Sequence, residues 1–481
     1  MSELHLLNAS RALEKLKARE ITALDLTTDC LRQIKSVDPV LRAWVTVSPE
    51  MALHQAAAVD AQIDAGKPLG ALSGIPVGVK DIFNTRDFPT QMGSPIWQGF
   101  TPGNDARVVH YLRMAGAVIP GKTVTAEFAV HTPGPTGNPH NPAYMPGTSS
   151  SGSAVAVAAY MVPLALGTQT AGSTIRPASY CGVYGFKPSF GLFPRTGMLK
   201  TTDTLDTVGF FARDVNDLAI LFEVMRVRGL DYPLIERKLS APAHRERPNG
   251  RPWRIALVRG PKWDYAETHA QRALYEFAAR LQTDSEFDLH DVELPSTFSR
   301  AHEIHGVIYD RTLAYYFKNE FQQHTLVSPT MYEIIRRGNE ISLAQYQQAL
   351  DAQVALAQEL DAFFANRFDV ILNLATGGEA LYGLDSLDRP DNCLVWTLCG
   401  VPAINLPIFV GPNGLPFGAQ IVARRYSDYL LLAFAYALAA RGLIPTETFP
   451  IPALTMRPTW FQALKPSTND VSLNNGQTID A

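Results

Sequence analysis

Two short segments rich in serine, threonine and glycine hold most of the side chains of this sequence that could do chemistry. The first spans 147–153 (Gly-Thr-Ser-Ser-Ser-Gly-Ser) and the second spans 167–177 (Gly-Thr-Gln-Thr-Ala-Gly-Ser-Thr-Ile-Arg-Pro). Between them, residues 154–166 are apolar and mostly small, which is typical of a buried helix that leads into a buried strand. Burying hydroxyl groups beside such elements costs free energy unless each finds a partner, so we expect these hydroxyls to be used.

Neither a flexible linker nor a phosphate-binding loop fits the two segments well. A linker would lack the apolar flanks at 154–166 and 180–190. A phosphate-binding loop needs a lysine before its helix, and Gly152-Ser153 offers none.

A nucleophilic serine needs a base within hydrogen-bond reach. No Gly-x-Ser-x-Gly elbow with a well-placed histidine and aspartate is present, so a Ser-His-Asp triad stays an alternative without a supporting motif.

Lys80 is the candidate base. It follows an apolar stretch at 75–79 that is bounded by Gly74, and this pattern predicts a buried strand that ends at the lysine. Catalytic groups of α/β folds lie at the ends of such strands. Most lysines are solvated surface residues, but desolvation at a buried strand end lowers the pKa of an amine and makes its neutral, basic form available.

These segments resemble the signature of the amidase signature family, serine hydrolases of amides. The family's motif reads roughly Gly-Gly-Ser-Ser-Gly-Gly-Ser followed by Gly-Thr-Asp-x-Gly-Gly-Ser-x-Arg-x-Pro. The likeness extends to the lysine segment at 74–81, to 181–189, and to 396–403 and 414–420 near the C-terminus. The stretch 203–212 also resembles a family segment that lies near the active centre. The resemblance therefore covers most of the chain.

Carried over position by position, the resemblance implies a Ser-cisSer-Lys mechanism. Its nucleophile falls on Ser173, its bridging serine, held on a cis peptide bond, on Ser149, and its base on Lys80. The implied enzyme is an amidase that hydrolyses the C–N bond of a small linear amide, other than a peptide bond, to a carboxylate and ammonia or an amine through an acyl-enzyme. The oxyanion hole would consist of backbone N–H groups of Thr170, Ala171, Gly172 and Ser173.

The sequence departs from the family pattern at three positions. Ala171 and Gln169 replace a glycine and an aspartate, and Arg176 stands one place later than in the commonest pattern. The Arg176 guanidinium could hold a carboxylate bidentately, which predicts an acid-bearing amide as substrate. The alternative is a structural arginine that ties loops together.

Three aromatic residues give a competing substrate prediction. Phe128, Tyr144 and Trp396 could line an apolar pocket for an aryl amide, or they could pack in the core. Two other functions also remain open. The chain could be the amidase subunit of a glutamine-dependent amidotransferase, or a non-catalytic amidase-like binding protein, although the retention of Lys80, Ser149 and Ser173 together argues against the second.

Composition narrows the class of protein. Hydrophobic residues make up 46% of the 481 residues and the net charge is −4, which favours a large apolar core and gives no sign of nucleic acid or membrane as partner. The four cysteines show no metal-ligand spacing, and no secretory or membrane-spanning segment is apparent, so we expect a cytoplasmic protein. The resemblance implies no cofactor and no metal. The expected ligand is a small-molecule amide, and the sequence leaves a homodimer open.

The alternation of helical and strand patterns predicts an α/β fold with a large mixed β-sheet covered by helices on both faces. We expect a single amidase domain over 1–464, with a less regular connection at about 226–251 and a disordered tail at 465–481. Thr22 and Asp25 form a capping-box pattern for a helix. Hydrophobic periodicity predicts helices over 51–65, 108–115, 214–225, 268–282, 343–364 and 428–441. It predicts strands over 42–47, 75–79, 117–120, 254–258, 369–374, 403–407 and 418–422.

Overall fold

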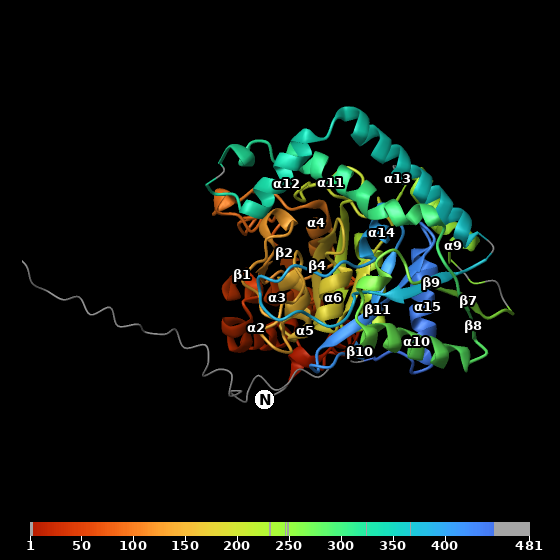
Figure 1. Ribbon diagram of the computed structural model, residues 1–481. Coiled ribbons are helices and arrows are strands. Elements are labelled where there is room, and N and C mark those ends of the chain that lie inside the picture. The colour runs from red at the N-terminus through yellow and green to blue at the C-terminus, as the bar shows by residue number, and fades with distance from the viewer. Residues whose placement is uncertain are drawn as a thin grey trace, which may run out of the picture. The chain divides into compact units, whose positions relative to one another are not determined.

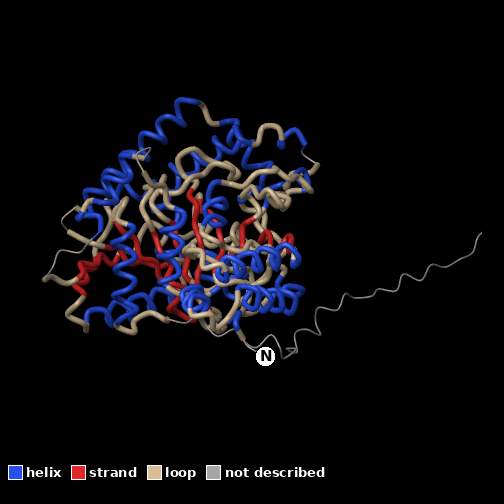
Figure 2. The backbone as a smooth tube through the Cα atoms, turned by 180° about the vertical axis from the view of Figure 1, so that it is seen from behind, coloured by secondary structure: helices blue, strands red, loops and turns tan. Residues whose placement is uncertain are grey.

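A computed structural model shows an eleven-stranded mixed sheet with helices on both faces (Figures 1 and 2). It describes residues 3–446 except 230–231, 246, 248–249, 324 and 366. The tail predicted at 465–481 lies outside the described residues, so the domain limits stay a prediction. The α/β fold class predicted from the sequence is confirmed.

The strands run through the sheet in the order β1-β3-β2-β4-β6-β5-β10-β11-β9-β7-β8. The pairs β2–β3, β2–β4, β7–β8 and β7–β9 are parallel, and the other pairs are antiparallel. Their bounds are β1 Trp44–Val47, β2 Val77–Lys80, β3 Gly121–Thr123, β4 Leu164–Gln169, β5 Tyr184–Lys187, β6 Thr207–Ala212, β7 Trp253–Leu257, β8 Phe287–Asp291, β9 Val370–Leu374, β10 Ala403–Val410 and β11 Pro416–Ala423.

The helices cover the sheet and also build a layer of their own, in which α11, α12 and α13 lie along the upper side of Figure 1. The α-helices are α1 Ala9–Lys17, α2 Ala23–Leu41, α3 Pro49–Asp64, α4 Arg107–Met114, α5 Ser151–Ala158, α6 Ile175–Cys181, α7 Val215–Met225, α8 Pro233–Ser240, α9 Pro242–Arg245, α10 Thr268–Gln282, α11 Ala301–Tyr316, α12 Pro329–Glu340, α13 Leu343–Phe364, α14 Cys393–Leu398 and α15 Asp428–Ala440. The predicted capping box of Thr22 and Asp25 starts α2. The connection at 226–251 contains α8 and α9.

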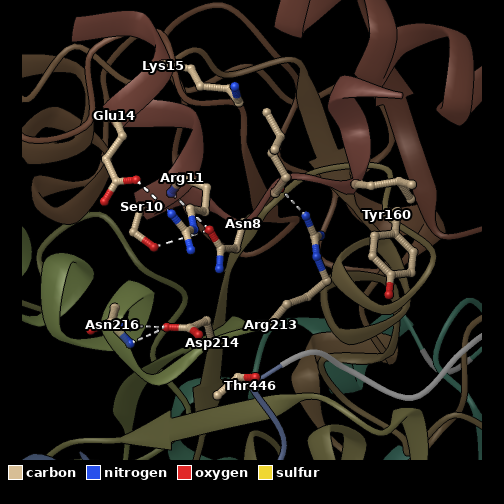
Figure 3. Close-up of a pocket in the computed structure, with 12 residues that line it drawn as sticks. Asn8, Ser10, Arg11, Glu14, Lys15, Tyr160, Arg213, Asp214, Asn216 and Thr446 are labelled. Carbon is tan, nitrogen blue, oxygen red and sulfur yellow. Dashed lines mark hydrogen bonds and ion pairs between the residues drawn. The ribbon is translucent and has the colours of Figure 1, made fainter. Parts of the chain in front are cut away.

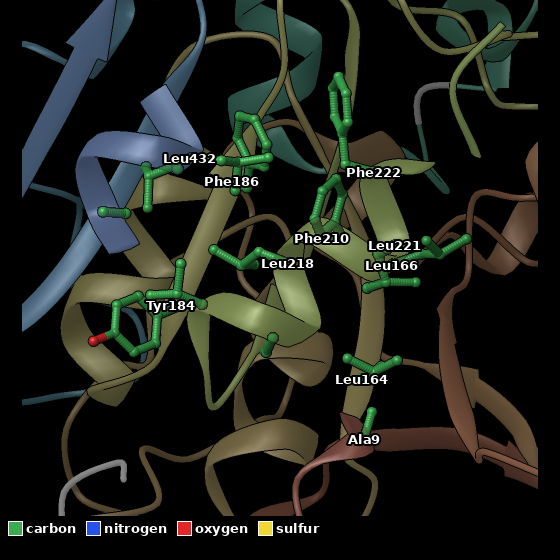
Figure 4. Packing of buried hydrophobic residues seen from close by; sticks show 14 of the residues in the cluster. Ala9, Leu164, Leu166, Tyr184, Phe186, Phe210, Leu218, Leu221, Phe222 and Leu432 are labelled. Carbon is green, nitrogen blue, oxygen red and sulfur yellow. The ribbon is translucent and has the colours of Figure 1, made fainter. Parts of the chain in front are cut away.

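The main core lies where α7 packs on the central strands. Phe186 of β5, Phe210 of β6 and Phe222 of α7 are fully buried (Figure 4). Phe186 stacks on Phe222 and meets Phe210 edge-on. Phe186 and Phe222 have ring centroids 5.7 Å apart at an interplanar angle of 18°. Aromatic pairs of this kind add stabilisation beyond the burial of their area, so they fix the sheet that carries the serine-rich segments.

Local sequence patterns place most elements within a few residues, with clear exceptions. The strand predicted over 117–120 is wrong: Val118 makes only an isolated bridge to Pro76, and β3 begins at Gly121. Pro120 has no N–H to donate to a ladder, which limits pairing there. The sequence patterns do not predict the helices α11 and α12 or the strand β8. Helix α11 buries polar residues such as His305, so its sequence lacks the clear alternation of apolar and polar faces from which a helix is predicted.

A matched pair of helix glycines tests how closely the first serine-rich segment packs against the rest of the chain. A Cβ on Gly152 of α5 would overlap the backbone of Ala43 and Val124, whereas a Cβ on Gly306 of α11 would meet no atom within 4 Å. We expect Gly152→Ala to lower the thermal midpoint strongly or to prevent folding. Gly306→Ala should leave the midpoint unchanged or raise it, since alanine is favoured over glycine in a helix by about 1 kcal/mol. Equal midpoints for both variants would contradict this packing.

Candidate active site

Parallel pairing of β2 and β4 brings the lysine and the hydroxyl residues to one edge of the sheet. Val79 of β2 pairs with Leu166 of β4, so both strands end on the same side, where Lys80 and Thr168 lie. Helix α5 begins at Ser151, immediately after Ser149 and Ser150. Gly167 permits this approach, because a Cβ there would lie 3.0 Å from the Ser150 Oγ. The edge therefore collects one amine and several hydroxyls.

The Lys80 amine lies among three hydroxyl groups. Its Nζ is 2.7 Å from the Ser149 Oγ, 2.9 Å from the Ser150 Oγ and 2.9 Å from the Thr168 Oγ1. The Lys80 side chain is fully buried. The sequence prediction that β2 is a buried strand ending at Lys80 is confirmed.

Burial is the main cause of the altered acidity of this lysine. It lowers the pKa of Lys80 well below the ordinary value of 10.5, while the carboxylate of Asp206 acts in the opposite direction. A neutral amine has two N–H groups and one lone pair, so two of the three hydroxyls can accept a hydrogen bond from it and the third can donate to it. Lys80 can therefore accept a proton from one of its hydroxyl neighbours.

Ser149 has a second partner besides Lys80. Its Oγ donates to the Ala129 carbonyl oxygen at 3.0 Å. All peptide bonds of the described residues are trans, so the cis bond expected at Ser149 is not found. For a residue other than proline the trans form is favoured by about 2.5–4 kcal/mol. Here Gly147, with φ of +88°, makes the turn that leads the chain to Ser149.

Ser173 lies in the turn between β4 and α6 and is half-buried. Its hydroxyl makes no hydrogen bond to the residues that the structure describes. Within the same set of residues, the N–H groups of Ala171, Gly172 and Ser173 also find no acceptor. Consecutive unpaired N–H groups are suited to binding a negatively charged oxygen. The turn thus presents one free hydroxyl together with free backbone donors.

The side chain of Gln169 supports this turn at the position where the family pattern has aspartate. Its Oε1 accepts from Thr174 N at 2.9 Å and from Ile175 N at 3.0 Å, and its Nε2 donates to Thr397 Oγ1 at 3.0 Å. The amide oxygen therefore caps the first turn of α6 as a carboxylate oxygen would. The amide nitrogen also donates a hydrogen bond to Thr397 of α14. A carboxylate has no N–H, so an aspartate at this position could only accept a hydrogen bond from the threonine hydroxyl.

Asp206 is a further polar residue of this region, and no sequence motif points to it as part of the site. It is buried and accepts from the Thr170 Oγ1 at 2.8 Å, as well as from backbone and side-chain groups of Thr201 and Thr202. Only the likeness of the stretch 203–212 to a family segment near the active centre could have indicated it. An aspartate in a threonine-rich stretch carries no local signal of such a role, because its place in the site depends on the packing of the whole turn.

Arg176 forms a buried ion-pair cluster with two aspartates. Its Nε is 2.7 Å from Asp391 Oδ2 and its NH1 is 2.6 Å from Asp388 Oδ2. Thr148, next to Ser149, donates to the same Asp388 oxygen at 2.6 Å. Burial disfavours the guanidinium cation, but the two carboxylates outweigh it and hold the pKa of Arg176 well above its ordinary value. The arginine is thus charged and already paired, and it ties three loops together.

The three aromatic residues considered for a substrate pocket occupy different environments. Phe128 is fully buried against Phe317, with ring centroids 4.7 Å apart, and Trp396 is fully buried in α14. Tyr144 is half-buried and packs edge-on against Tyr382, which is 73% exposed. Phe128 and Trp396 therefore belong to the core, and only the Tyr144–Tyr382 pair reaches the surface.

A cavity of about 1000 Å³ lies elsewhere, between the N-terminal segment and the start of α7. Asn8, Arg11, Tyr160, Arg213 and Asp214 are among its lining residues (Figure 3). In the wall of this cavity, the NH1 and NH2 groups of Arg213 bind backbone carbonyls. They donate to the carbonyls of His5, Leu7, Val157 and Val162. Arg213 therefore fastens the N-terminal segment to the α5–β4 connection.

The chain is similar to known proteins over most of its length. The model of the amidase family matches residues 25–432. This chain belongs to the amidase family. It is 31% identical to a subunit of the glutamyl-tRNA(Gln) amidotransferase from Picosynechococcus sp., over 89% of the chain and 97% of that protein. The corresponding protein of Acidothermus cellulolyticus is 32% identical, over 94% and 99% of the two chains.

A solved structure is similar over most of its length. The peptide amidase of Stenotrophomonas maltophilia superposes with a TM-score of 0.78 at 28% identity, covering 92% of this amidase-family chain and 98% of that protein. The family membership expected from the sequence is confirmed, and it places the chain among amide-hydrolysing enzymes. Among the described residues, no helix has the length and apolar character that crossing a membrane would require.

The Arg176 cluster makes a testable contribution to stability. Replacing one member of a buried ion pair leaves uncompensated charge, which costs about 3–5 kcal/mol. We expect Arg176→Met to lower the denaturant midpoint strongly, because Asp388 and Asp391 lose their cation. The matched control is Arg300→Met, which removes an exposed pair with Glu303 and should leave the midpoint unchanged. Similar midpoints for the two variants would show that the cluster does not hold the loops.

Proposed function

We propose that this chain is a serine-dependent amidase that hydrolyses the C–N bond of a small amide through an acyl-enzyme. Ser173 is the nucleophile, Ser149 the proton relay and Lys80 the base. The observation that carries the proposal is the fully buried Lys80 amine, 2.7 Å from Ser149, with a lowered pKa. Without burial the amine would be protonated at neutral pH and could not accept a proton.

In the acylation step, the Ser173 Oγ attacks the carbonyl carbon of the amide. In this step the Ser149 hydroxyl turns its hydrogen from the Ala129 carbonyl to the lone pair of Lys80. Ser173 passes its proton to Ser149, and Ser149 passes its own proton to Lys80. The free N–H groups of Ala171, Gly172 and Ser173 stabilise the negative oxygen of the tetrahedral intermediate. Collapse of the intermediate breaks the C–N bond, and the leaving nitrogen takes the proton back through Ser149. Water then attacks the ester in the same way and releases a carboxylic acid.

The charge around Arg176 supports a substrate without a carboxylate at this position. The guanidinium is bound by two carboxylates, so the cluster carries a net negative charge rather than a free cation. The acid-bearing amide predicted from the sequence needs an unpaired arginine. A neutral amide fits better, with the Tyr144–Tyr382 pair as the exposed aromatic surface.

The nucleophile assignment is tested with a fluorophosphonate probe and a panel of small amides. Ser173→Ala should abolish labelling and turnover, and Ser149→Ala and Lys80→Met should cause severe losses. The matched control is Ser151→Ala in the same segment. The buried Ser151 hydroxyl has no hydrogen-bond partner among the described residues, so its removal should preserve both activity and stability. Normal labelling of Ser173→Ala would overturn the assignment.

The role of Lys80 predicts a pH dependence of acylation. Only the neutral amine accepts a proton, so kcat/KM should rise with pH through the pKa of Lys80 and reach a plateau well below the ordinary 10.5. Because the Asp206 carboxylate raises this pKa, Asp206→Asn should move the rising limb to lower pH. A limb near 10.5 in the wild type, or an upward shift in the variant, would contradict the proposed base.

The similarity to amidotransferase subunits supports a second candidate function, that of an amidotransferase subunit. The proteins at 31–32% identity are subunits of an amidotransferase, so this chain could release ammonia from glutamine for a partner protein. Turnover of small amides by the purified chain alone supports the amidase. Activity that requires both glutamine and a second protein supports the amidotransferase function. If no amide or ester is turned over and the probe does not label the chain, a binding protein remains.

The preference for uncharged substrates has its own test. We expect a higher kcat/KM for a neutral diamide than for the half-amide of the same dicarboxylic acid. Arg176→Lys should lower both values by a similar factor, because it disturbs the cluster and not a contact with substrate. A selective loss for the half-amide in Arg176→Lys would show instead that the arginine binds a carboxylate.

A further inference from the structure

Helix α11, which lies outside the serine-rich segments, places a histidine against the turn that precedes Ser173. His305 is 4% exposed, and the Nε2 of its ring lies 2.9 Å from the Thr170 carbonyl oxygen. A carbonyl oxygen only accepts hydrogen bonds, so the Nε2 must carry the hydrogen. His305 therefore donates to the first peptide group of the turn.

This hydrogen bond also sets the direction of a backbone donor. In a trans peptide group the C=O and the N–H point in opposite directions. With the Thr170 carbonyl held toward α11, the N–H of Ala171 points away from that helix. This is one of the N–H groups that has no acceptor among the described residues.

Thr397 of α14 holds the next peptide group in the same way. Its Oγ1 lies 2.7 Å from the Ala171 carbonyl oxygen, which fixes the direction of the Gly172 N–H. The same Oγ1 lies farther, at 3.2 Å, from the Cys393 carbonyl oxygen one helical turn back. Gln169 donates to this threonine hydroxyl at 3.0 Å, so the hydroxyl hydrogen is left for the nearer carbonyl. Two consecutive peptide groups of the turn are thus held by side chains from two different helices.

The surroundings of His305 keep its donor in place. Burial lowers the pKa of His305 to about 4, with His302 and His131 acting in the same direction and the Thr170 carbonyl opposing them. The ring is neutral at neutral pH and stacks on Tyr309, with centroids 5.4 Å apart at an angle of 25°. The stacking fixes the ring plane, and neutrality leaves one N–H, which the Thr170 carbonyl engages.

We propose that His305 and Thr397 are positioning residues that preorganise the oxyanion donors of this amidase. The inference rests on the proposed function, because it assigns the N–H groups of Ala171 and Gly172 to the tetrahedral intermediate. Neither side chain touches the reacting atoms. Each aligns a peptide group before the substrate arrives, which avoids a reorganisation cost during the reaction.

The test compares variants that remove the donor with variants that retain it. His305→Leu and Thr397→Val lose their hydrogen bonds to the turn, whereas His305→Gln and Thr397→Ser can still donate to the same carbonyls. With the amide that the wild type hydrolyses best, we expect the first pair to lose kcat by ~10–100-fold, somewhat less than the loss of an oxyanion donor itself. KM should change little, and the second pair should recover most of the rate.

A second readout separates positioning from a general structural role. A boronic acid that matches the acyl group of the substrate forms a tetrahedral adduct with Ser173, while the carboxylate product is planar. In His305→Leu and Thr397→Val, affinity for the boronic acid should fall by a factor similar to that of kcat, and inhibition by the product should not change. Thermal midpoints establish that each variant is folded. If His305→Leu does not fold, the Thr397 pair carries the test.

The outcomes are distinguishable. Equal losses of boronic acid and product affinity, or no rescue by glutamine and serine, would overturn the positioning role. Rates equal to the wild type in both donor-deleted variants would overturn it as well, while leaving the amidase proposal intact. Absence of turnover and of probe labelling in the wild type would instead overturn the proposed function.

Discussion

The structure depends on the burial of one amine. Lys80 is fully enclosed at the end of β2, and its Nζ lies within 2.9 Å of three hydroxyl groups. An ammonium ion in such a place is costly, so the lysine is held nearer to its neutral form and gains basicity toward its neighbours. The residues around the amine must be small, since larger side chains would separate the amine from the hydroxyls.

Close backbone approach is the second requirement of this arrangement. A Cβ on Gly147 would lie 2.7 Å from the Pro177 Cα, so this glycine joins the two serine-rich segments. Gly167 plays the same part between β4 and Ser150. The hydroxyl groups are then held by backbone partners: the Ser153 Oγ, for example, donates to the Leu166 carbonyl at 2.7 Å. The two segments form a rigid frame because close packing leaves their backbone and side chains no room to adopt other conformations.

The buried charges in and beside this frame are neutralised by partners from other parts of the chain. Arg176 is neutralised by Asp388 and Asp391, and Lys122 pairs with Asp81, directly after the base, at 3.1 Å. Both clusters join segments that are distant in the sequence. The loop that carries Asp388 also reaches Thr148, one residue before Ser149. The surroundings of the reacting groups are thus set by contacts that no single segment contains.

The sequence by itself determined the α/β class, the buried strand that ends at Lys80 and the family likeness, because these depend on local periodicity and on short motifs. The tertiary structure alone decided which partners the side chains meet. Arg176 is paired because residues 388 and 391 return to it from more than two hundred positions away. His305 reaches the turn because α11 packs against it. Such contacts arise from the packing of whole helices and strands, so local sequence patterns do not predict them.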